Sequence, residues 1–199
     1  MSNELESLDW AKGDGLLPVV VQDAGNLRVL MLGYMNAEAL AATQSSGFVT
    51  FYSRSKQRLW KKGESSGHVL QLVSIQADCD HDTLLVLARP QGPTCHLQRD
   101  SCFADAPASF IADLDALVAQ RERERPAASY TTKLFDEGIR RIAQKVGEEG
   151  VETALAAVVQ DDPALLGESA DLVFHLLVLL RARGLSLQDV SSVLQQRHK

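Results

Sequence analysis

Two pairs of acidic residues stand inside otherwise apolar helical stretches in the second half of the chain. Glu149 and Glu152 are three residues apart, and so are Glu168 and Asp171. Residues at that spacing share one face of a helix, so each pair directs two carboxylates the same way. Unpaired buried carboxylates are costly, and they shift their pKa, find cations or bind metal. Two such helices packed together predict a cluster of oxygen ligands suited to Mg²⁺, a plausible place to cleave a polyphosphate.

A second acidic cluster lies in the segment Asp78-Cys79-Asp80-His81-Asp82. If this segment is extended, the three aspartates share one face and the cysteine and histidine share the other. Three carboxylates on one face favour Mg²⁺, whereas the thiolate favours Zn²⁺. An Asp-rich turn between two strands, with no metal, explains the spacing alone equally well.

Three cysteines, Cys79, Cys95 and Cys102, fall within one window of 24 residues. Their odd number and the lack of an export signal argue against a disulfide framework. Three thiolates would leave the fourth position of a zinc ion open for water, as in catalytic sites. Zinc lowers the pKa of that water to about 7. Three buried apolar thiols are the alternative interpretation.

Residues 53–68 form a basic patch in an acidic protein. Five Lys and Arg side chains surround Trp60, and a Gly/Ser turn follows. Such a patch suits a phosphorylated ligand whose base can stack on an aromatic ring. A solvated hairpin end is the alternative.

The first half of the chain, residues 1–106, must position the cysteines, the aspartates and the basic patch. It contains short strand-like runs separated by turn signals. These runs are LPVVVQ, LRVLMLGY, FVTFYS, HVLQLVSIQ and TLLVLA. Asn36 is the expected N-cap of one short helix. We predict a mainly-β, α+β domain.

The second half, residues 107–199, has helical periodicity and is predicted to be an all-α domain. Four helices are expected, over residues 108–125, 129–159, 163–184 and 186–199. Pro163 opens the third helix, Gly184 closes it, and Ser186 is the N-cap of the fourth.

Bulk composition limits the classes of function. The chain has 199 residues, of which 45% are hydrophobic and 23% are charged, as is ordinary for a soluble globular protein. A net charge of −6 is opposite in sign to the overall positive charge typical of nucleic-acid-binding proteins. No apolar run approaches the roughly 18 residues of a membrane span, and the N-terminus lacks a signal-peptide core. We expect a cytoplasmic protein.

Together these segments resemble the bifunctional family of histidine biosynthesis, in which a phosphoribosyl-AMP cyclohydrolase is fused to a phosphoribosyl-ATP pyrophosphatase. The cyclohydrolase matches are FYSRSKQRLWKKGESSGH, DCDHDTLLVL, GPTCH and SCF. The pyrophosphatase matches are SYTTKLFDEGIRRIAQKVGEEGVETALAA and ESADLVFHLLVLL. They follow the order of the fused enzyme and cover nearly the whole chain.

The resemblance implies two consecutive hydrolyses of nucleotide substrates. Residues 107–199, with a MazG-like helical fold, would convert phosphoribosyl-ATP to phosphoribosyl-AMP and pyrophosphate. Residues 1–106 would then open the adenine ring at the N1–C6 bond, giving phosphoribosylformimino-aminoimidazole carboxamide ribonucleotide.

For the first half, the resemblance implies metal ligands and a homodimer. Cysteines of the family that match Cys79, Cys95 and Cys102 bind zinc, in a site shared between two subunits. The matching aspartates that bind magnesium are Asp78, Asp80 and Asp82. His96 matches a histidine with an acid–base role, and orienting a ligand is its alternative role. Positions expected to hold phosphate and ribose are Arg54, Lys56, Trp60, Lys62 and Glu64.

For the second half, the resemblance implies a magnesium site with the pattern E-x-x-E…E-x-x-D. The matching ligands are Glu149, Glu152, Glu168 and Asp171. Glu148 is expected to join the site or act as the base. The cations expected to meet phosphates are Lys133, Arg141 and Lys145. Arg140 points about 100° away from its neighbour Arg141, so only one of the two is expected to face the site.

Three alternatives stay open. One half could be inactive and serve only dimerisation, or the chain could be a zinc-stabilised nucleotide-binding module without catalysis. A general triphosphate pyrophosphatase would explain only the helical half.

Overall fold

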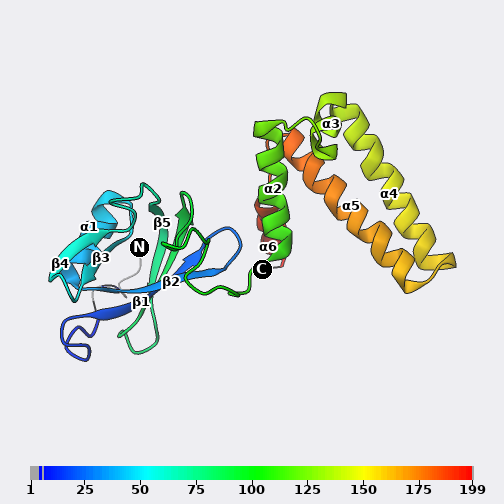
Figure 1. Cartoon of the computed structure of the whole chain (residues 1–199). Coiled ribbons are helices and arrows are strands. Elements are labelled where there is room, and N and C mark those ends of the chain that lie inside the picture. Colours follow the sequence, from blue (N-terminus) through cyan, green and yellow to red (C-terminus); the bar gives the residue numbers. More distant parts are fainter. Residues whose placement is uncertain (1–4, 6, 199) are drawn as a thin grey trace. The chain divides into compact units, whose positions relative to one another are not determined.

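The structure, a computed structural model, describes residue 5 and residues 7–198. Its contacts divide the chain into two compact units, the first ending at Ser109 and the second beginning at Phe110 (Figure 1). The first unit is rich in strands and the second is entirely helical over its described residues, as the sequence predicts.

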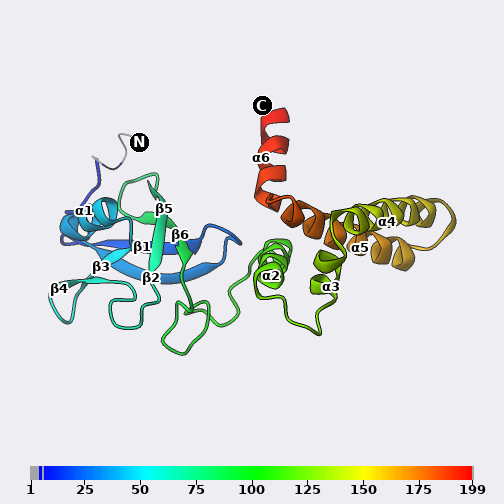
Figure 2. The same ribbon diagram turned by 90° about the horizontal axis from the view of Figure 1, so that it is seen from above.

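A four-stranded sheet forms the centre of the first unit, in the order β2-β1-β6-β5 (Figure 2). Its strands are β1 (Leu17–Asp23), β2 (Val29–Met35), β5 (Leu70–Ala77) and β6 (Leu84–Pro90). Strand β1 runs antiparallel to β2 and parallel to β6, and β6 runs antiparallel to β5. The connection from β5 to β6 is the segment that contains the aspartate cluster.

A smaller antiparallel pair, β3 (Thr50–Ser53) and β4 (Arg58–Lys61), packs against the same core. The sequence analysis missed β4, because its charged residues lack a strand-like alternation. Pairing with β3 places Trp60 opposite the fully buried Phe51, with ring centroids 5.1 Å apart.

The core of the first unit is built from the alternate residues of β1 and β6. Leu17, Val19 and Val21 of β1 are fully buried, while the residues between them are only partly buried. Because side chains alternate along a strand with a period of two, one face of the sheet points toward the core. Each such side chain contributes about 1.5–3 kcal/mol relative to an exposed position. Helix α1 (Ala37–Ser46) lies on this core, and its N-cap Asn36 accepts a hydrogen bond from the Ala39 N–H, as predicted.

Five helices form the described part of the second unit. They are α2 (Phe110–Glu124), α3 (Tyr130–Glu137), α4 (Ile139–Val159), α5 (Asp162–Ala182) and α6 (Leu187–Arg197). Helices α4 and α5 form a long hairpin (Figure 1). The predicted cap Ser186 begins α6 in a reciprocal capping box with Asp189.

The prediction of one long helix over residues 129–159 is wrong. Gly138 has φ 85° and separates α3 from α4. Its backbone N–H bonds the carbonyls of Leu134 and Phe135, which ends α3. Positive φ is inexpensive only for glycine, so this residue permits the chain to turn between two helical segments.

Of the two interpretations of Asp78–Asp82, the extended segment is wrong and the turn between two strands is confirmed. These residues form the turn between β5 and β6, and His81 has φ 60°. The cluster therefore owes its shape to a turn and not to the alternation of a strand.

Helix α5 is long and apolar enough to cross a membrane by length and composition, with a mean hydropathy of 1.6 over 18 residues. The sequence analysis did not anticipate it, because Glu168, Asp171 and His175 interrupt the apolar runs. Core helices of soluble proteins pass the same test, so α5 is weak evidence for a membrane.

Candidate active sites

The aspartate turn of the first unit is folded by Asp78. Its Oδ1 accepts hydrogen bonds from the backbone N–H groups of Asp82, at 3.0 Å, and Thr83, at 3.1 Å. The turn gathers one carboxylate oxygen each from Asp78, Asp80 and Asp82 within 4.8 Å of one another. Oxygen donors this close suit a hard divalent cation such as Mg²⁺.

Lys12 supplies a cation to this turn from a distant part of the chain. Its Nζ lies 2.6 Å from Oδ2 of Asp80 and also pairs with Oδ2 of Asp82. Hydrogen bonds to these two carboxylates raise the pKa of Lys12, and the bond from Lys12 lowers the pKa of Asp82. The sequence analysis did not identify Lys12, which lies 68 residues before Asp80 and belongs to no local motif.

The structure brings two of the three cysteines together. The buried thiol of Cys95 and the exposed thiol of Cys102 lie close enough for each to shift the pKa of the other. The Leu97 N–H lies 3.5 Å from Cys95 Sγ and lowers the pKa of Cys95, whereas burial and then Cys95 raise the pKa of Cys102. Cys79 is exposed in the aspartate turn, and the described residues contain no cluster of three cysteine ligands.

Two predicted site residues adjoin the cysteine pair. His96 is exposed, and its Nδ1 lies 3.9 Å from the sulfur of Cys95. Lys62 is half-buried, and burial lowers the pKa of its ammonium group, while the charges of Cys102 and Cys95 oppose that shift. The basic patch therefore reaches the cysteine pair through Lys62.

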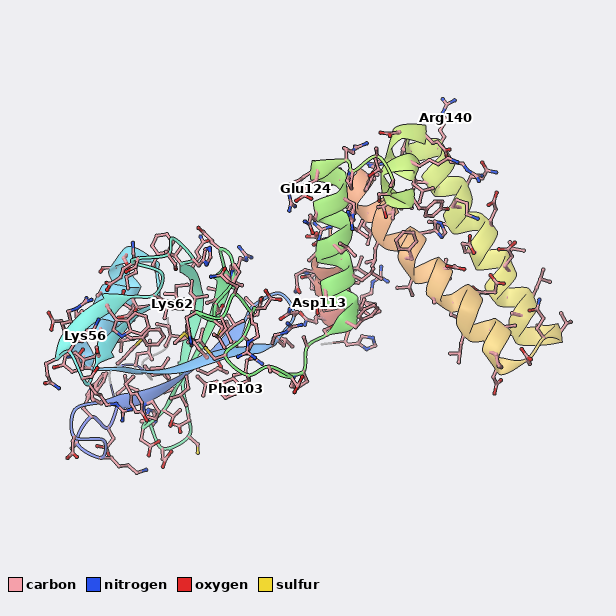
Figure 3. The ribbon with its side chains drawn as sticks, viewed as in Figure 1. Lys56, Lys62, Phe103, Asp113, Glu124 and Arg140 are labelled. Carbon is pink, nitrogen blue, oxygen red and sulfur yellow. The ribbon has the colours of Figure 1, made fainter. Side chains whose placement is uncertain are left out.

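A surface hollow of about 160 Å³ occupies the basic patch. Three of the predicted substrate residues line it together with two that the sequence analysis did not assign, and the five are Ser53, Lys56, Arg58, Trp60 and Glu64. Lys56 precedes strand β4 and Lys62 follows it, and both are labelled in Figure 3. The predicted residue Arg54 instead stacks on the ring of Tyr34, 3.9 Å from its centroid.

Arg58 forms an ion pair with Glu64 at this hollow. One guanidinium nitrogen lies 2.6 Å from Oε1 of Glu64 and the other lies 3.4 Å from Oε2. The guanidinium lowers the pKa of Glu64 below its usual range. The five-cation patch was the available signal for Arg58, but only the three-dimensional pairing separates it from its basic neighbours.

A second acidic cluster forms where α4 faces α5 in the second unit. Single oxygens of Glu149, Glu152 and Glu168 lie within 4.8 Å of one another. Glu152 is exposed, but partial desolvation and then the charges of Glu149 and Glu168 raise its pKa. Such repulsion is relieved by a bound cation. Asp171 is exposed on α5 and is not part of this closest group.

Lys145 neutralises the buried side of the helical cluster. Its Nζ lies 2.6 Å from Oε1 of Glu149 and 3.0 Å from Oε2 of Glu148. These bonds raise the pKa of Lys145, and the bond from Lys145 lowers the pKa of Glu148, which keeps that carboxylate ionised. Arg141 reaches Oε1 of Glu148 at 3.4 Å.

The remaining two cations of this region lie farther out. Arg140 points away from α5 in Figure 3. The exposed Lys133 has its Nζ 3.8 Å from Oε1 of Glu137. The described part of each unit thus combines an acidic cluster with cations, an arrangement able to hold a metal ion and a phosphorylated ligand.

Comparison with protein families divides the chain at the same place. Residues 31–104 match the family model for phosphoribosyl-AMP cyclohydrolase, and residues 111–198 match that for phosphoribosyl-ATP pyrophosphohydrolase.

Similar relatives match both halves at once, and each carries the name histidine biosynthesis bifunctional protein HisIE. The relative from Xanthomonas axonopodis pv. citri is 75% identical over 195 residues, which cover 98% of this chain and 95% of the relative. The relative from Yersinia pestis is 56% identical, and the match covers 98% of this chain and 97% of the relative. The Escherichia coli relative is 58% identical and covers 96% of each chain.

Proposed function

The chain belongs to the bifunctional histidine-biosynthesis family that joins a phosphoribosyl-AMP cyclohydrolase to a phosphoribosyl-ATP pyrophosphohydrolase, and we propose that each half holds its own metal-dependent site. The enzyme hydrolyses phosphoribosyl-ATP to phosphoribosyl-AMP and pyrophosphate, and then opens the adenine ring of phosphoribosyl-AMP. We assign ring opening to residues 1–106 and pyrophosphate release to residues 107–199. The acidic cluster with its lysine in each half is the observation that carries this assignment.

In the helical half, the proposed magnesium ligands are the cluster carboxylates and Asp171 one turn away. The closeness of three oxygens, and the repulsion that raises the pKa of Glu152, fit a divalent cation. Magnesium, when bound, offsets polyphosphate charge and orients water. Glu148 is ionised and is placed to accept the proton of the attacking water. Lys145, Arg141 and Lys133 bind the phosphate groups in this proposal, because ion pairs through Glu148 and Glu137 connect these three cations of α4 and α3.

In the first half, the proposed zinc ligands are the three cysteines and the proposed magnesium ligands are the three aspartates of the turn. The close pair of Cys95 and Cys102 fits a soft metal, and the oxygen cluster fits a hard one. Zinc, when bound, supplies a water of lowered pKa. Water adds to C6, the N1–C6 bond breaks, and N1 takes up a proton. His96 is the group we assign to this proton transfer, because it adjoins Cys95.

The substrate of ring opening is proposed to bind in the basic hollow. Lys56 and Trp60 line the hollow and offer a phosphate contact and an aromatic face. Glu64, held by Arg58, offers a carboxylate that can accept hydrogen bonds from ribose hydroxyls. Lys62 extends the binding surface toward the cysteines, and Arg54 flanks it above Tyr34.

Two features support a homodimer. Cys79 stands apart from the cysteine pair within one chain, which is expected if a second copy supplies the third zinc ligand. The α4–α5 hairpin also exposes large apolar side chains, among them Val151, Leu155, Val158, Val159 and Leu166. Apolar surface gathered on one hairpin is typical of a face that a partner covers. A cytoplasmic location accords with a biosynthetic enzyme of this family.

A product time course tests the proposal. The full chain is supplied with phosphoribosyl-ATP, Mg²⁺ and Zn²⁺, and products are followed by liquid chromatography and mass spectrometry. We expect pyrophosphate to appear together with the ring-opened nucleotide, and chelation to stop both. Accumulation of phosphoribosyl-AMP would contradict the assignment of the first half, and unchanged substrate would contradict both assignments.

A further inference from the structure

His175 is a buried polar side chain that the proposed chemistry does not use. It lies on α5 one turn after Asp171 and is only 4% exposed. A histidine buried to this degree is either a packed core residue or a group that acts on a neighbour. Its hydrogen-bond partners decide between these roles.

The contacts of His175 fix the position of its proton. Nδ1 lies 2.9 Å from the backbone carbonyl oxygen of Asp171 and 3.6 Å from Oε1 of Glu149. Both neighbours are acceptors, so Nδ1 must carry a hydrogen. Nε2 lies 3.2 Å from the hydroxyl of Tyr130 and accepts its hydrogen bond in the neutral ring. The imidazole is therefore held from α3 and donates to the backbone of α5, while its Nδ1–H lies beside Oε1 of Glu149 as an electrostatic neighbour, at a distance too long for a hydrogen bond.

Tyr130 is itself held in place by aromatic packing. Its ring stacks on Phe174 at 6.2 Å between centroids and meets the edge of His175 at 6.1 Å. This packing limits rotation of both rings, so the Nδ1–H direction is set by three side chains from two helices.

Glu149 is the buried member of the helical cluster, at 4% exposure. Its Oε1 has two positive neighbours, the Lys145 ammonium at 2.6 Å and the polar Nδ1–H of His175. Donors on one oxygen of a carboxylate orient the other oxygen. Partners of this kind, standing behind a metal ligand, are worth about 10–100-fold in metal affinity.

We propose that His175 is a positioning residue, which with Tyr130 fixes the Glu149 carboxylate for metal binding and pyrophosphate release. The inference rests on the metal site proposed above for the helical half. It gives His175 a function beyond filling space, and it extends the site to α3.

Two substitutions, each of which keeps a nitrogen at the place of one ring nitrogen, separate a positioning role of His175 from a packing role. In the variant His175→Asn, the side-chain amide nitrogen is as many bonds from Cβ as Nδ1 is in histidine. In the variant His175→Gln, the amide nitrogen is as many bonds from Cβ as Nε2 is. Both variants replace the ring by a shorter or differently shaped side chain, so a packing role alone predicts similar losses of metal affinity. Positioning predicts that His175→Asn keeps the donor toward Glu149 and that His175→Gln loses it.

The readout is Mn²⁺ affinity, measured by electron paramagnetic resonance of free Mn²⁺. The zinc-loaded full chain carries Asp80→Asn and Asp82→Asn, so that only the helical cluster offers its carboxylates. We expect affinity to fall about 10–100-fold in His175→Gln and to stay within about threefold of the parent in His175→Asn. Tyr130→Phe, which keeps the ring, is expected to lose about two- to tenfold.

Equal losses in His175→Asn and His175→Gln, or unchanged affinity in both, would overturn the inference. Failure of the metal site itself is distinguishable, because the parent chain would then bind Mn²⁺ no better than its Glu152→Gln variant. The calorimetric transition of the helical unit checks that each His175 variant is folded.

Discussion

The ammonium nitrogen of Lys12 lies 2.6 Å from Oδ2 of Asp80, among the carboxylates that we assign to a magnesium ion. The same nitrogen pairs with Asp82. An ammonium group and a divalent cation cannot both occupy the space between these oxygens. Binding of metal to the aspartate turn is therefore an exchange, in which Lys12 must leave.

Replacing Lys12 should strengthen metal binding at the aspartate turn. We expect Lys12→Met to raise Mn²⁺ affinity about threefold to tenfold, a modest gain because the displaced ion pairs are solvent-exposed. The measurement uses the zinc-loaded full chain with Glu152→Gln, so that the helical cluster is weakened. Lys61→Met removes the same charge from β4 and should leave the affinity unchanged. Weaker binding in Lys12→Met would show that the lysine supports the metal instead of competing with it.

Cys95→Ser should abolish ring opening while pyrophosphate release continues. A serine hydroxyl is a poor substitute for a thiolate as a zinc ligand, and Cys95 is the buried member of the cysteine pair. Phosphoribosyl-AMP should then accumulate from phosphoribosyl-ATP, and bound zinc, measured by atomic absorption, should fall. Normal ring opening in this variant would refute the zinc assignment.

Glu152→Gln should reverse that pattern. Loss of a cluster carboxylate is expected to slow pyrophosphate release by more than about 100-fold, because even partners behind a ligand are worth about 10–100-fold. Added phosphoribosyl-AMP should still be opened at the normal rate. Without metal the variant should melt at a higher temperature than the parent above the pKa of Glu152, since the repulsion that raises this pKa is removed. If both activities fell together, a shared site would replace the two-site assignment.

Asp115→Ala should destabilise the helical unit alone. Asp115 is buried on α2, and its two oxygens take a paired hydrogen bond from Arg181 of α5, one of them at 3.0 Å from Nε. Removing one partner of a buried pair costs about 3 kcal/mol. In calorimetry we expect the transition of the helical unit to move to lower temperature and that of the first unit to stay. The exposed residue Glu124 on the same helix, changed to Ala, provides a comparison.

Local signals in the sequence were sufficient for several features of the fold. Asn36 and Ser186 cap their helices as predicted, because a cap is a short-range hydrogen bond between near neighbours. Gly138 was not recognised as a break, because the apolar helical pattern continues on both sides of it. Its φ of 85° is set by how α3 and α4 pack, which no local pattern records.

The candidate sites were predictable as residue types and only partly as geometry. The three aspartates do gather, but through a turn held by Asp78 and not through the expected alternation. Lys12 acts through a contact from a distant segment, so spacing gave no signal for it. The spacing of His175, one turn after Asp171, suggested that it could touch the site, but its contacts with Tyr130 and Glu149 come from other helices. Arg58 was visible as a charge, but its pairing with Glu64 required the β3–β4 hairpin.

The lysine within each of the two acidic clusters bears on the order in which the enzyme folds and binds metal. Lys12 and Lys145 already offset part of the negative charge that would otherwise oppose collapse of these segments. A newly made chain can therefore reach its native shape before any magnesium arrives, unlike small zinc domains that stay unfolded without metal. On the metal assignment proposed above, magnesium loading is a late, reversible step on a folded chain. A cell short of magnesium would then accumulate folded, inactive enzyme that metal can activate, and not unfolded chains.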